Sequence, residues 1–569
     1  MGDSTTSVHS NIVKKKSFDQ APQAHESTCS SELATESTLT KKKPTSKWIT
    51  IFFPEEDHHE ISKKHADATL DLIQNTGGYD EIPDFTEAQE KKLYRKLWFT
   101  VLLLTFLVNT CLFIDKDAIS YSQLLGVWED MGFGKQQYNN ILTYFYVGYI
   151  LGQIPSHYLF QRLPISKFLT GVIAIWSLLS FCTLGCKSYG GMSALRFFLG
   201  FVESGVTPAL QHTLTMFFTP EEFAIVNPIF YISCMGIDII LSFISYGLQH
   251  AVYWRPWKWF WLIIAIVSAL CSVMCYFLYP DNPATSILFT KEERIQIIRR
   301  VKRSTRSSIE QKTFKYYQFI ECLKDPISWL FMFFSFCDQL SNSTTYQSSI
   351  IYTSLGFSRL TTTLVMAVQN GFSTFCGIVG SLSLYFFKSQ SFIVGALFAV
   401  PAFMGAIIAV SIDYDNKPGL LAGIMMTRSN GTFFIIGLGL CTATAGGYTK
   451  RLTRTLLFMI VYSVANIIAP QLWKPQYSPR YRISWITQIV FSWFLAPLSL
   501  ILIRIILSAR NKKRLADIAA YGGDDDTIDS DEFGFVDVID EDGNIVKQKV
   551  DISMLDLTDH ENKRFIYPL

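Results

Sequence analysis

The residues of this sequence whose types and spacing could do chemistry are ionisable side chains within long apolar segments. Asp115, Lys116 and Asp117 end one such segment, and Arg196 and Glu203 interrupt another. A charge at the centre of a membrane helix costs at least about 2.5–3.5 kcal/mol, so residues of this kind indicate function. Arg196 and Glu203 are separated by about two helical turns, which places both on one face of a helix.

If the two segments face each other, their charged residues share one polar cleft. A carboxylate beside Lys or Arg is held ionised, and its proton affinity changes when an anionic substrate takes over the cation. The pattern therefore favours proton-coupled transport of an anion. The alternative is a static ion-pair network that only joins two helices, although ion pairs are a costly way to do so.

The elements that position these residues are long apolar runs. Eight runs contain no Asp, Glu, Lys or Arg, and each is close to the ~20 residues that cross a bilayer as a helix. They are residues 97–114, 136–161, 168–186, 259–280, 360–387, 389–412, 455–473 and 483–503. Such repetition excludes a soluble enzyme.

Four further runs are interrupted by one or two ionisable residues: 191–218, 223–251, 327–351 and 418–444. The sequence thus predicts twelve membrane-spanning helices. The whole chain is 17% charged, below the roughly 25% of soluble proteins. We also expect no nucleic-acid partner, since the net charge is only +2 and the basic residues lie at span ends.

The spans divide into two halves of six around a basic segment. We expect a disordered cytoplasmic N-terminal tail (1–90), a six-helix half (91–280), a cytoplasmic central loop (281–326), a second six-helix half (327–508) and an acidic cytoplasmic C-terminal tail (509–569), whose acidic stretch from Asp524 to Asp542 is also expected to be disordered. Lys and Arg at the span ends favour both termini in the cytoplasm. This plan resembles major facilitator transporters, whose halves rock about a central site. The predicted fold is therefore an all-α, twelve-helix major facilitator fold.

Short motifs strengthen this resemblance and narrow it. The fourth span reads RFFLGFVESGVTP from Arg196, the first ends DKDAISY from Asp115, and the second contains YILGQIPS from Tyr149. GGYTKR from Gly446, NIIAPQ from Asn466 and DLTDHEN from Asp556 add to them. Together they are similar to the anion:cation symporter family of the major facilitator superfamily, in its fungal allantoate permease-like branch. The pattern is also similar to the fungal thiamine-pathway transporter subgroup.

The resemblance implies roles for particular residues. Asp115 and Glu203 would be proton-coupling residues, and Lys116 and Arg196 would bind the substrate's carboxylate. We add four candidates for substrate binding: Tyr121 from the first-span motif, Arg428 in the tenth span, and Asp338 and Asn342 in a polar patch of the seventh.

The predicted function is import of a small organic anion with protons by a monomer in the plasma membrane. No metal cluster, nucleophile triad or phosphate loop is apparent, so we expect neither an enzyme nor a cofactor. Two alternatives remain open. One is a nutrient sensor that binds the anion and signals through its tails. The other is a carrier of a cationic thiamine-related compound, with Asp238 and Asp338 as counter-charges.

The sequence departs from the family pattern where substrate contacts are expected. The segment from Pro220 to Asn227 lacks the usual basic residues, Met235 precedes Gly236 where Asn is usual, and Thr444 replaces an expected Asn. Substrate specificity therefore cannot be carried over from the family.

Overall fold

The structure is a computed structural model of the whole chain. It describes residues 85–251, 254–305, 315–521, 533–539, 545–551, 557–562 and 565–569, all within the compact unit Asp57–Leu569. Residues 1–84, which make up most of the expected N-terminal tail, lie outside the described residues.

The first six spans are helical and follow the predicted segments closely. The first is one continuous helix, Glu87–Leu124, and the fourth is interrupted at Ser204 and Gly205. The elements are α3 (Glu87–Leu97), η2 (Trp98–Leu102), α4 (Leu103–Leu124), α5 (Val127–Met131), α6 (Lys135–Arg162), α7 (Ile165–Leu184), α8 (Tyr189–Glu203), α9 (Val206–Phe217), α10 (Pro220–Leu248) and α11 (Pro256–Leu278).

The second six spans contain more interruptions, and two short helices precede them. The preceding helices are α12 (Lys291–Thr305) and α13 (Tyr316–Lys324). The spans and their connections comprise α14 (Pro326–Gln339), α15 (Ser343–Ser354), α16 (Arg359–Phe386), η3 (Lys388–Gln390), α17 (Ser391–Ser411), α18 (Lys417–Met426), η4 (Thr427–Ser429), α19 (Asn430–Ala443), α20 (Tyr448–Ile468), η5 (Ala469–Leu472), η6 (Pro475–Tyr477), α21 (Arg482–Val490), η7 (Phe491–Leu495) and α22 (Ala496–Tyr521).

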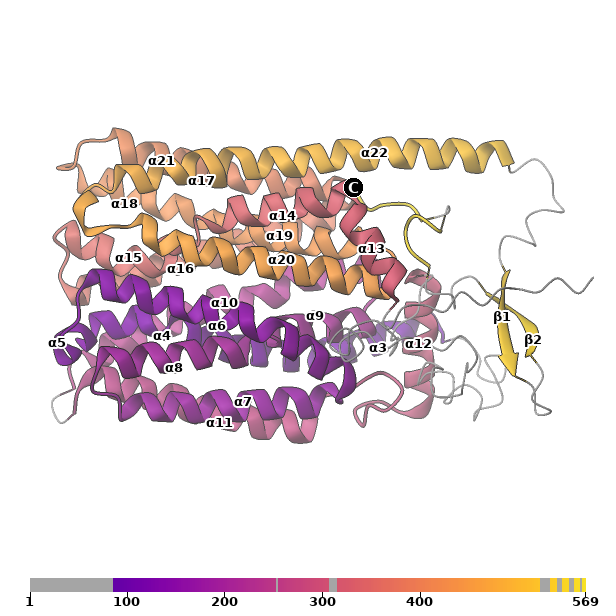
Figure 1. Cartoon of the computed structure of the whole chain (residues 1–569), viewed down its shortest axis with the longest axis horizontal. Coiled ribbons are helices and arrows are strands. Elements are labelled where there is room, and N and C mark those ends of the chain that lie inside the picture. Colours follow the sequence, from indigo (N-terminus) through magenta and orange to yellow (C-terminus); the bar gives the residue numbers. More distant parts are fainter. Residues whose placement is uncertain are drawn as a thin grey trace, which may run out of the picture. The chain divides into compact units, whose positions relative to one another are not determined.

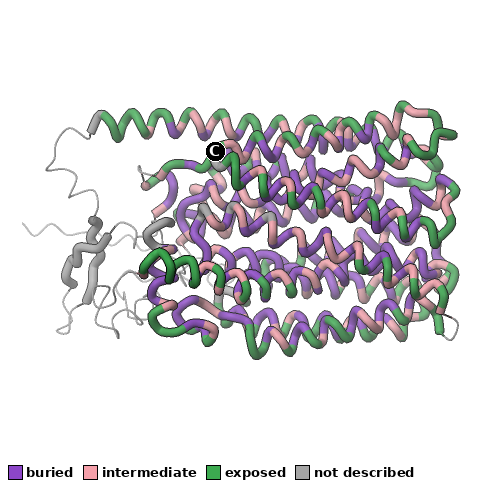
Figure 2. Tube along the Cα trace, turned by 180° about the vertical axis from the view of Figure 1, so that it is seen from behind, coloured by how far each residue is buried: buried purple, intermediate pink, exposed green. Residues whose placement is uncertain are grey.

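The described helices confirm the twelve predicted spans. By length and composition, 9 helical segments are apolar enough to cross a membrane. The other three spans are α6, which carries several amide side chains, and the interrupted pairs α8–α9 and α14–α15. Exposed residues lie on the outer faces of the helices and buried residues between them (Figure 2). Large apolar side chains such as Leu270, Leu397 and Ile505 are exposed, as expected for a lipid-facing surface.

Local sequence explains where several spans begin. The side chains of Ser188, Thr219 and Asp325 accept hydrogen bonds from backbone N–H groups in the first turns of α8, α10 and α14. These N-caps satisfy donors that the helices cannot satisfy themselves. Pro220 and Pro326 follow two of the caps, where a missing N–H costs nothing.

Glycines allow α6 and α8 to pack backbone against backbone. A Cβ atom on Gly148 would overlap the carbonyl of Phe197, and one on Gly200 would overlap the carbonyl of Phe145. Only glycine fits such an approach. The contact fixes the position of α8, and with it the positions of the two charged residues that α8 carries.

The two halves are hydrogen-bonded near α5, at one end of the helices (Figure 1). Tyr138 of α6 donates to the backbone carbonyl of Tyr346 of α15 at 3.0 Å. Gln347 of α15 donates to Asn139 of α6 at 2.7 Å, and Arg359 of α16 pairs with Glu129 of α5. These contacts hold the halves together at what we call the α5 end. The central-segment helices α12 and α13 lie at the opposite end.

The C-terminal segment is more ordered than the sequence predicted. Helix α22 continues to Tyr521, and β1 (Phe533–Ile539) pairs antiparallel with β2 (Ile545–Asp551). This pairing differs from the predicted disorder of the acidic tail.

Candidate functional site

Four of the predicted site residues meet where α4 faces α8. The Arg196 side chain donates to the backbone carbonyl of Asp115 at 3.3 Å. The Asp115 carboxylate accepts a hydrogen bond of 2.8 Å from the Ser180 hydroxyl of α7. Glu203 is fully buried, and its charged neighbours are Asp115, Lys116 and Arg196. The expected juxtaposition of the first and fourth spans is therefore present.

Aromatic rings surround the two cations of this cluster. The guanidinium carbon of Arg196 lies 4.8 Å from the centre of the Trp261 ring of α11. The Lys116 ammonium lies 5.1–5.9 Å from the ring centres of Phe113, Phe145, Tyr149 and Tyr462. Cation–π attraction stabilises a charge in such a position. Neither Lys116 nor Arg196 lines the cavity between the two halves of the protein.

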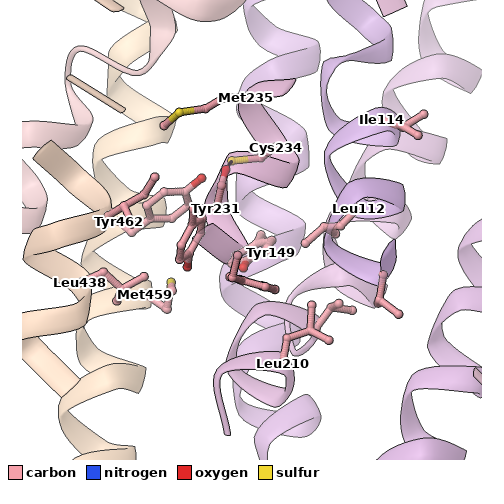
Figure 3. Close-up of a cluster of buried hydrophobic side chains, with 14 of the residues drawn as sticks. Leu112, Ile114, Tyr149, Leu210, Tyr231, Cys234, Met235, Leu438, Met459 and Tyr462 are labelled. Carbon is pink, nitrogen blue, oxygen red and sulfur yellow. Dashed lines mark hydrogen bonds between the residues drawn. The ribbon is translucent and has the colours of Figure 1, made fainter. Parts of the chain in front are cut away.

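A cavity of about 150 Å³ lies between the two halves, with room for on the order of ten water molecules. The first half contributes residues of α4 and α10, and the second half contributes residues of α14–α16, η4, α19, α20 and η7. Tyr231, Cys234 and Met235 extend from α10 toward Tyr462 of α20 (Figure 3). Among the described lining residues, the charged ones are Asp117, Asp238 and Arg428.

Arg428 is positioned by side chains of two neighbouring helices. Its guanidinium donates to the Thr345 hydroxyl of α15 and, at 3.4 Å, to the Asn370 side-chain carbonyl of α16. The third nitrogen, Nε, is buried and donates to none of the described residues. Arg428 is the charged neighbour shared by Asp117 and Asp238. It therefore faces the cavity instead of extending to the membrane surface.

A layer of amides surrounds Asp338 behind the cavity wall. One oxygen of the buried Asp338 carboxylate accepts from Gln339 at 2.8 Å, and the other accepts from Asn430 at 3.0 Å. Asn430 also accepts from the indole of Trp493 at 2.8 Å. Asn342 donates to Asn466 at 2.7 Å. Asn342 and the two amide partners of Asp338 line the cavity, whereas Asp338 itself does not.

Tyr121 is a buried neighbour of the cavity wall. Its hydroxyl donates to the backbone carbonyl of Asp238 at 2.9 Å and accepts from Asn370 at 3.3 Å. It thus joins α10 of the first half to α16 of the second and helps to position two lining residues. Of the six predicted substrate-binding residues, Arg428 and Asn342 line the cavity, while Tyr121, Asp338, Lys116 and Arg196 lie outside the lining.

Two lining carboxylates were not among the predicted site residues. Asp117 follows Asp115 by two positions, about 200° around a helix, so Asp115 faces α7 and α8 while Asp117 faces the cavity. Asp238 on α10 had been singled out as a counter-charge in the alternative for a cationic substrate. The sequence could have identified both as candidate site residues, because each is an ionisable residue within or at the end of a predicted span.

The described residues also contain one group with the side-chain types of a metal site. Ligand atoms of Asp325, Asp559 and His560 lie within 4.8 Å of one another. Lys450 and Arg454 already pair with the two carboxylates, at 2.6 Å to Asp559 and 2.9 Å to Asp325 respectively. Cations in those positions oppose a metal ion, so we interpret the group as part of an ion-pair network.

Comparisons with known proteins agree with this architecture. Residues 105–470 match the model of the Major Facilitator Superfamily. The chain is 40% identical over 519 residues to the high affinity cysteine transporter of Saccharomyces cerevisiae, covering 90% of this chain and 96% of the relative. It is 26% identical to the allantoate permease of the same yeast, over 85% of this chain and 88% of the relative.

A solved structure supports the fold alone. The crystal structure of a D-xylose-proton symporter superposes with a TM-score of 0.53 at 13% identity, covering 71% of this chain and 97% of the symporter. The described helices and the relatives together confirm the twelve-helix fold and the predicted resemblance to the allantoate permease-like branch.

Proposed function

Because the chain belongs to the Major Facilitator Superfamily, in its fungal allantoate permease-like branch, we propose that it imports a small organic carboxylate together with protons. It is a multi-pass membrane transporter and not an enzyme. The observation that carries the proposal is the central cavity, in which Arg428 is the cation among the described lining residues and retains donor capacity at Nε. Arginine is well suited to a carboxylate, because its planar donors match the two oxygens.

Proton coupling is proposed to begin at Glu203. Both of its carboxylate oxygens are buried and accept from no described N–H or hydroxyl group, and the carboxyl of Asp115 is its hydrogen-bonding neighbour. Two adjacent buried carboxylates repel each other, so a proton taken up by one relieves the repulsion. Glu203 and Asp115 therefore remain our candidates for the proton-coupling residues.

Lys116 connects this proton site to the cavity. Its charged neighbours are Glu203 on one side and Asp117 on the other, and Asp117 in turn neighbours Arg428. A proton on Glu203 removes one counter-charge of Lys116, which then interacts more strongly with Asp117. Arg428 is thereby released from Asp117 and can bind the carboxylate of the substrate. In this scheme Lys116 and Arg196 act on the substrate through their neighbours, not by direct contact.

The distribution of charged residues and the family support a proposal for the membrane location, orientation and oligomeric state of the transporter. We propose that it works as a monomer in the plasma membrane, with both termini cytoplasmic, because Lys and Arg gather at the span ends on that side. The α5 end would then face the outside. The halves are hydrogen-bonded at that end, and the rings of His212 of α9 and Tyr448 of α20 meet nearer the other end. The conformation described would then be one that is closed toward the outside in an alternating-access cycle.

A carrier of a cationic thiamine-related compound is the second candidate. It is favoured by the two carboxylates in the cavity, Asp117 and Asp238. Against it, Arg428 repels a cation from the same cavity. Asp338, which this candidate needs as a counter-charge, has both carboxylate oxygens engaged by amides.

Uptake measurements test the proposal. Cells that express the wild type or Glu203→Gln are given radiolabelled organic acids, vitamins and cysteine at acidic and at neutral external pH. We expect one carboxylate to enter faster at acidic pH, and the Glu203→Gln variant to lose that dependence. Glu292→Gln, an exposed carboxylate of α12, is the matched control. Uptake that ignores both pH and Glu203 contradicts the coupling, and uptake of cationic compounds alone favours the second candidate.

A further inference from the structure

The charges of the cavity are divided between the two halves of the transporter. Asp117 and Asp238 come from α4 and α10 of the first half, and Arg428 comes from η4 of the second. Arg428 is an electrostatic neighbour of both carboxylates. Among the described residues, however, its hydrogen bonds go to Thr345 and Asn370, not to either carboxylate. A ligand between the halves would therefore meet carboxylates on one side and a guanidinium on the other.

Both sides of the cavity retain capacity for a ligand. The Nε of Arg428 is buried and donates to none of the described residues, and the buried Oδ1 of Asp238 accepts from no described N–H or hydroxyl group. The hydrogen-bonding neighbour of the Asp238 carboxyl is the carboxyl of Asp117. Asp238 is 8% exposed and Asp117 is 6% exposed, so neither carboxylate is well solvated. A buried polar group without a partner is costly, and a ligand that supplies the missing partners would bind with corresponding strength.

We propose that the substrate is a small zwitterionic α-amino acid, bound through its carboxylate to Arg428 and through its ammonium to Asp117 and Asp238. This inference rests on the proposed transport of a carboxylate and specifies the substrate class of the same cavity. Three side chains would thus recognise the two charged groups that every α-amino acid carries.

The placement of charges in the cavity distinguishes α-amino acids from ligands that carry only a carboxylate or only an amine. With both carboxylates ionised, the three charged lining residues sum to one negative charge. A plain carboxylate would raise that to two and would leave the aspartates without a cation. A plain amine would satisfy the aspartates but would bring no acceptor to the buried Nε of Arg428, which donates to none of the described residues. A zwitterion places each of its charges against the opposite charge, and the low exposure of both carboxylates strengthens that attraction.

The rest of the lining limits the side chain of the substrate. Phe113, Met235 and Phe434 supply apolar surface. Apart from Asp117, Asp238 and Arg428, all the described lining residues are uncharged. A second negative charge on the ligand would therefore lack a partner. The volume of about 150 Å³ also favours a small ligand. The inference accordingly favours small α-amino acids without an acidic side chain.

Chemical truncation of the ligand tests the inference on the full-length wild-type protein. The purified transporter is titrated with cysteine, 3-mercaptopropionate, which lacks the ammonium group, and cysteamine, which lacks the carboxylate. Alanine, propionate and ethylamine form a second series. Thermal stabilisation reports binding, since a ligand that binds the folded state raises the melting temperature. For at least one series, we expect each truncated compound to bind about thirtyfold or more weakly than the amino acid.

Two variants should shift selectivity in opposite directions. Asp238→Asn should abolish the preference for the amino acid over its deaminated acid, and Arg428→Gln should abolish the preference over its decarboxylated amine. Glu292→Gln should retain both preferences. If Asp238→Asn does not fold, Asp117→Asn tests the same subsite.

The outcomes separate this inference from the transport proposal. Binding and uptake of deaminated acids as good as those of the amino acids would overturn the zwitterion inference and leave carboxylate transport intact. Variants that weaken all ligands equally would likewise contradict it. Failure of every carboxylate to be taken up would overturn both.

Discussion

Gln347 of α15 donates a hydrogen bond of 2.7 Å to the side-chain oxygen of Asn139 of α6, and both residues are completely buried. The bond joins the two halves of the transporter at the α5 end. Next to it, the backbone carbonyl of Tyr346 accepts from Tyr138, and Tyr346 also lines the cavity. The closed contact between the halves therefore lies directly beside the cavity.

Replacing Asn139 and Gln347 together by alanine should favour opening at the α5 end. A buried hydrogen bond contributes about 0.5–1.5 kcal/mol, which corresponds to a shift of roughly two- to tenfold in the ratio of the two conformations. Cys234 lines the cavity and serves as the reporter. We expect an impermeant thiol reagent applied from the α5 side to label Cys234 several times faster in the double variant, as measured by mass spectrometry of its peptide.

Gln136→Ala is the control for this experiment. Gln136 lies at the same end and bonds to Gln471, but its contacts are exposed to solvent. Water replaces such bonds at little cost, so labelling of Cys234 should stay near the wild-type rate. A double variant that folds normally and reacts no faster than Gln136→Ala would show that these amides do not hold the halves together.

Gly200→Ala should destabilise the first half. The added methyl group would overlap the carbonyl of Phe145 and push α8 away from α6. Overpacking of this kind costs about 1–3 kcal/mol or more and displaces the helix that carries Arg196 and Glu203. The melting temperature of the purified protein and its proton-dependent uptake should both fall. Gly171→Ala on α7 is the control, because a Cβ atom there meets no other atom within 4 Å. Equal effects of the two substitutions would contradict this packing argument.

Much of the architecture could be predicted because membrane burial leaves a simple signal. Runs without charge, each of bilayer length, marked the spans. The seven-residue spacing of Arg196 and Glu203 placed both on one face of α8, where they meet α4. These inferences use only helical periodicity and the cost of burying charge, and both operate locally along the chain.

The assignment of residues to the cavity depends on information that is not local. Asp115 and Asp117 are chemically identical and two positions apart, and only the rotation of α4 within the bundle decides that Asp117 faces the cavity. Asp338 lies in a polar patch that predicts a cavity residue, but the amides of Gln339 and Asn430 engage both of its carboxylate oxygens. Helix rotation and hydrogen-bond partners follow from packing among distant segments, which one sequence does not reveal.

The end of the chain is a second case of distant packing. Asp559 and Lys450 are both completely buried and form an ion pair of 2.6 Å. The Tyr567 hydroxyl donates to Asp559 at 2.7 Å, and the backbone carbonyl of Leu569 accepts from the N–H of Ser391 at 3.0 Å. The described residues 557–562 and 565–569 thus attach to α17 and α20 of the second half. The sequence motif DLTDHEN, which begins at Asp556, was identified only by its resemblance to the family. The resemblance did not indicate which residues the motif contacts.

Asp559→Asn should destabilise the second half. The substitution leaves the buried Lys450 ammonium with one fewer anionic partner. Removing one member of a buried ion pair costs about 3–5 kcal/mol, reduced here because Glu321 also pairs with Lys450, at 2.8 Å. We expect a clear fall in the melting temperature of the purified full-length protein. Ile566→Ala changes an exposed side chain of the same segment and should have little effect. Identical melting of Asp559→Asn and the wild type would show that the ion pair does not hold the segment.

The same ion pair should respond to acid but not to pH changes near neutrality. Burial alone would raise the pKa of Asp559, but the charges of Lys450 and Arg454 hold the pKa below its ordinary value. A carboxyl group whose pKa is lower in the folded state binds fewer protons there than in the unfolded state. Its stabilisation is therefore complete above the unfolded pKa of about 3.9 and is lost as the pH falls through the lower, folded value.

The difference in melting temperature between the wild type and Asp559→Asn measures this stabilisation. We expect the difference to be constant from about pH 8 to about pH 5 and to shrink only below about pH 4, since the group titrates only in that range. The ordinary pH range of a cell would then leave the C-terminal segment attached. A difference that already disappears between about pH 7 and pH 5 would mean that Asp559 titrates near neutrality, contrary to its pairing with Lys450.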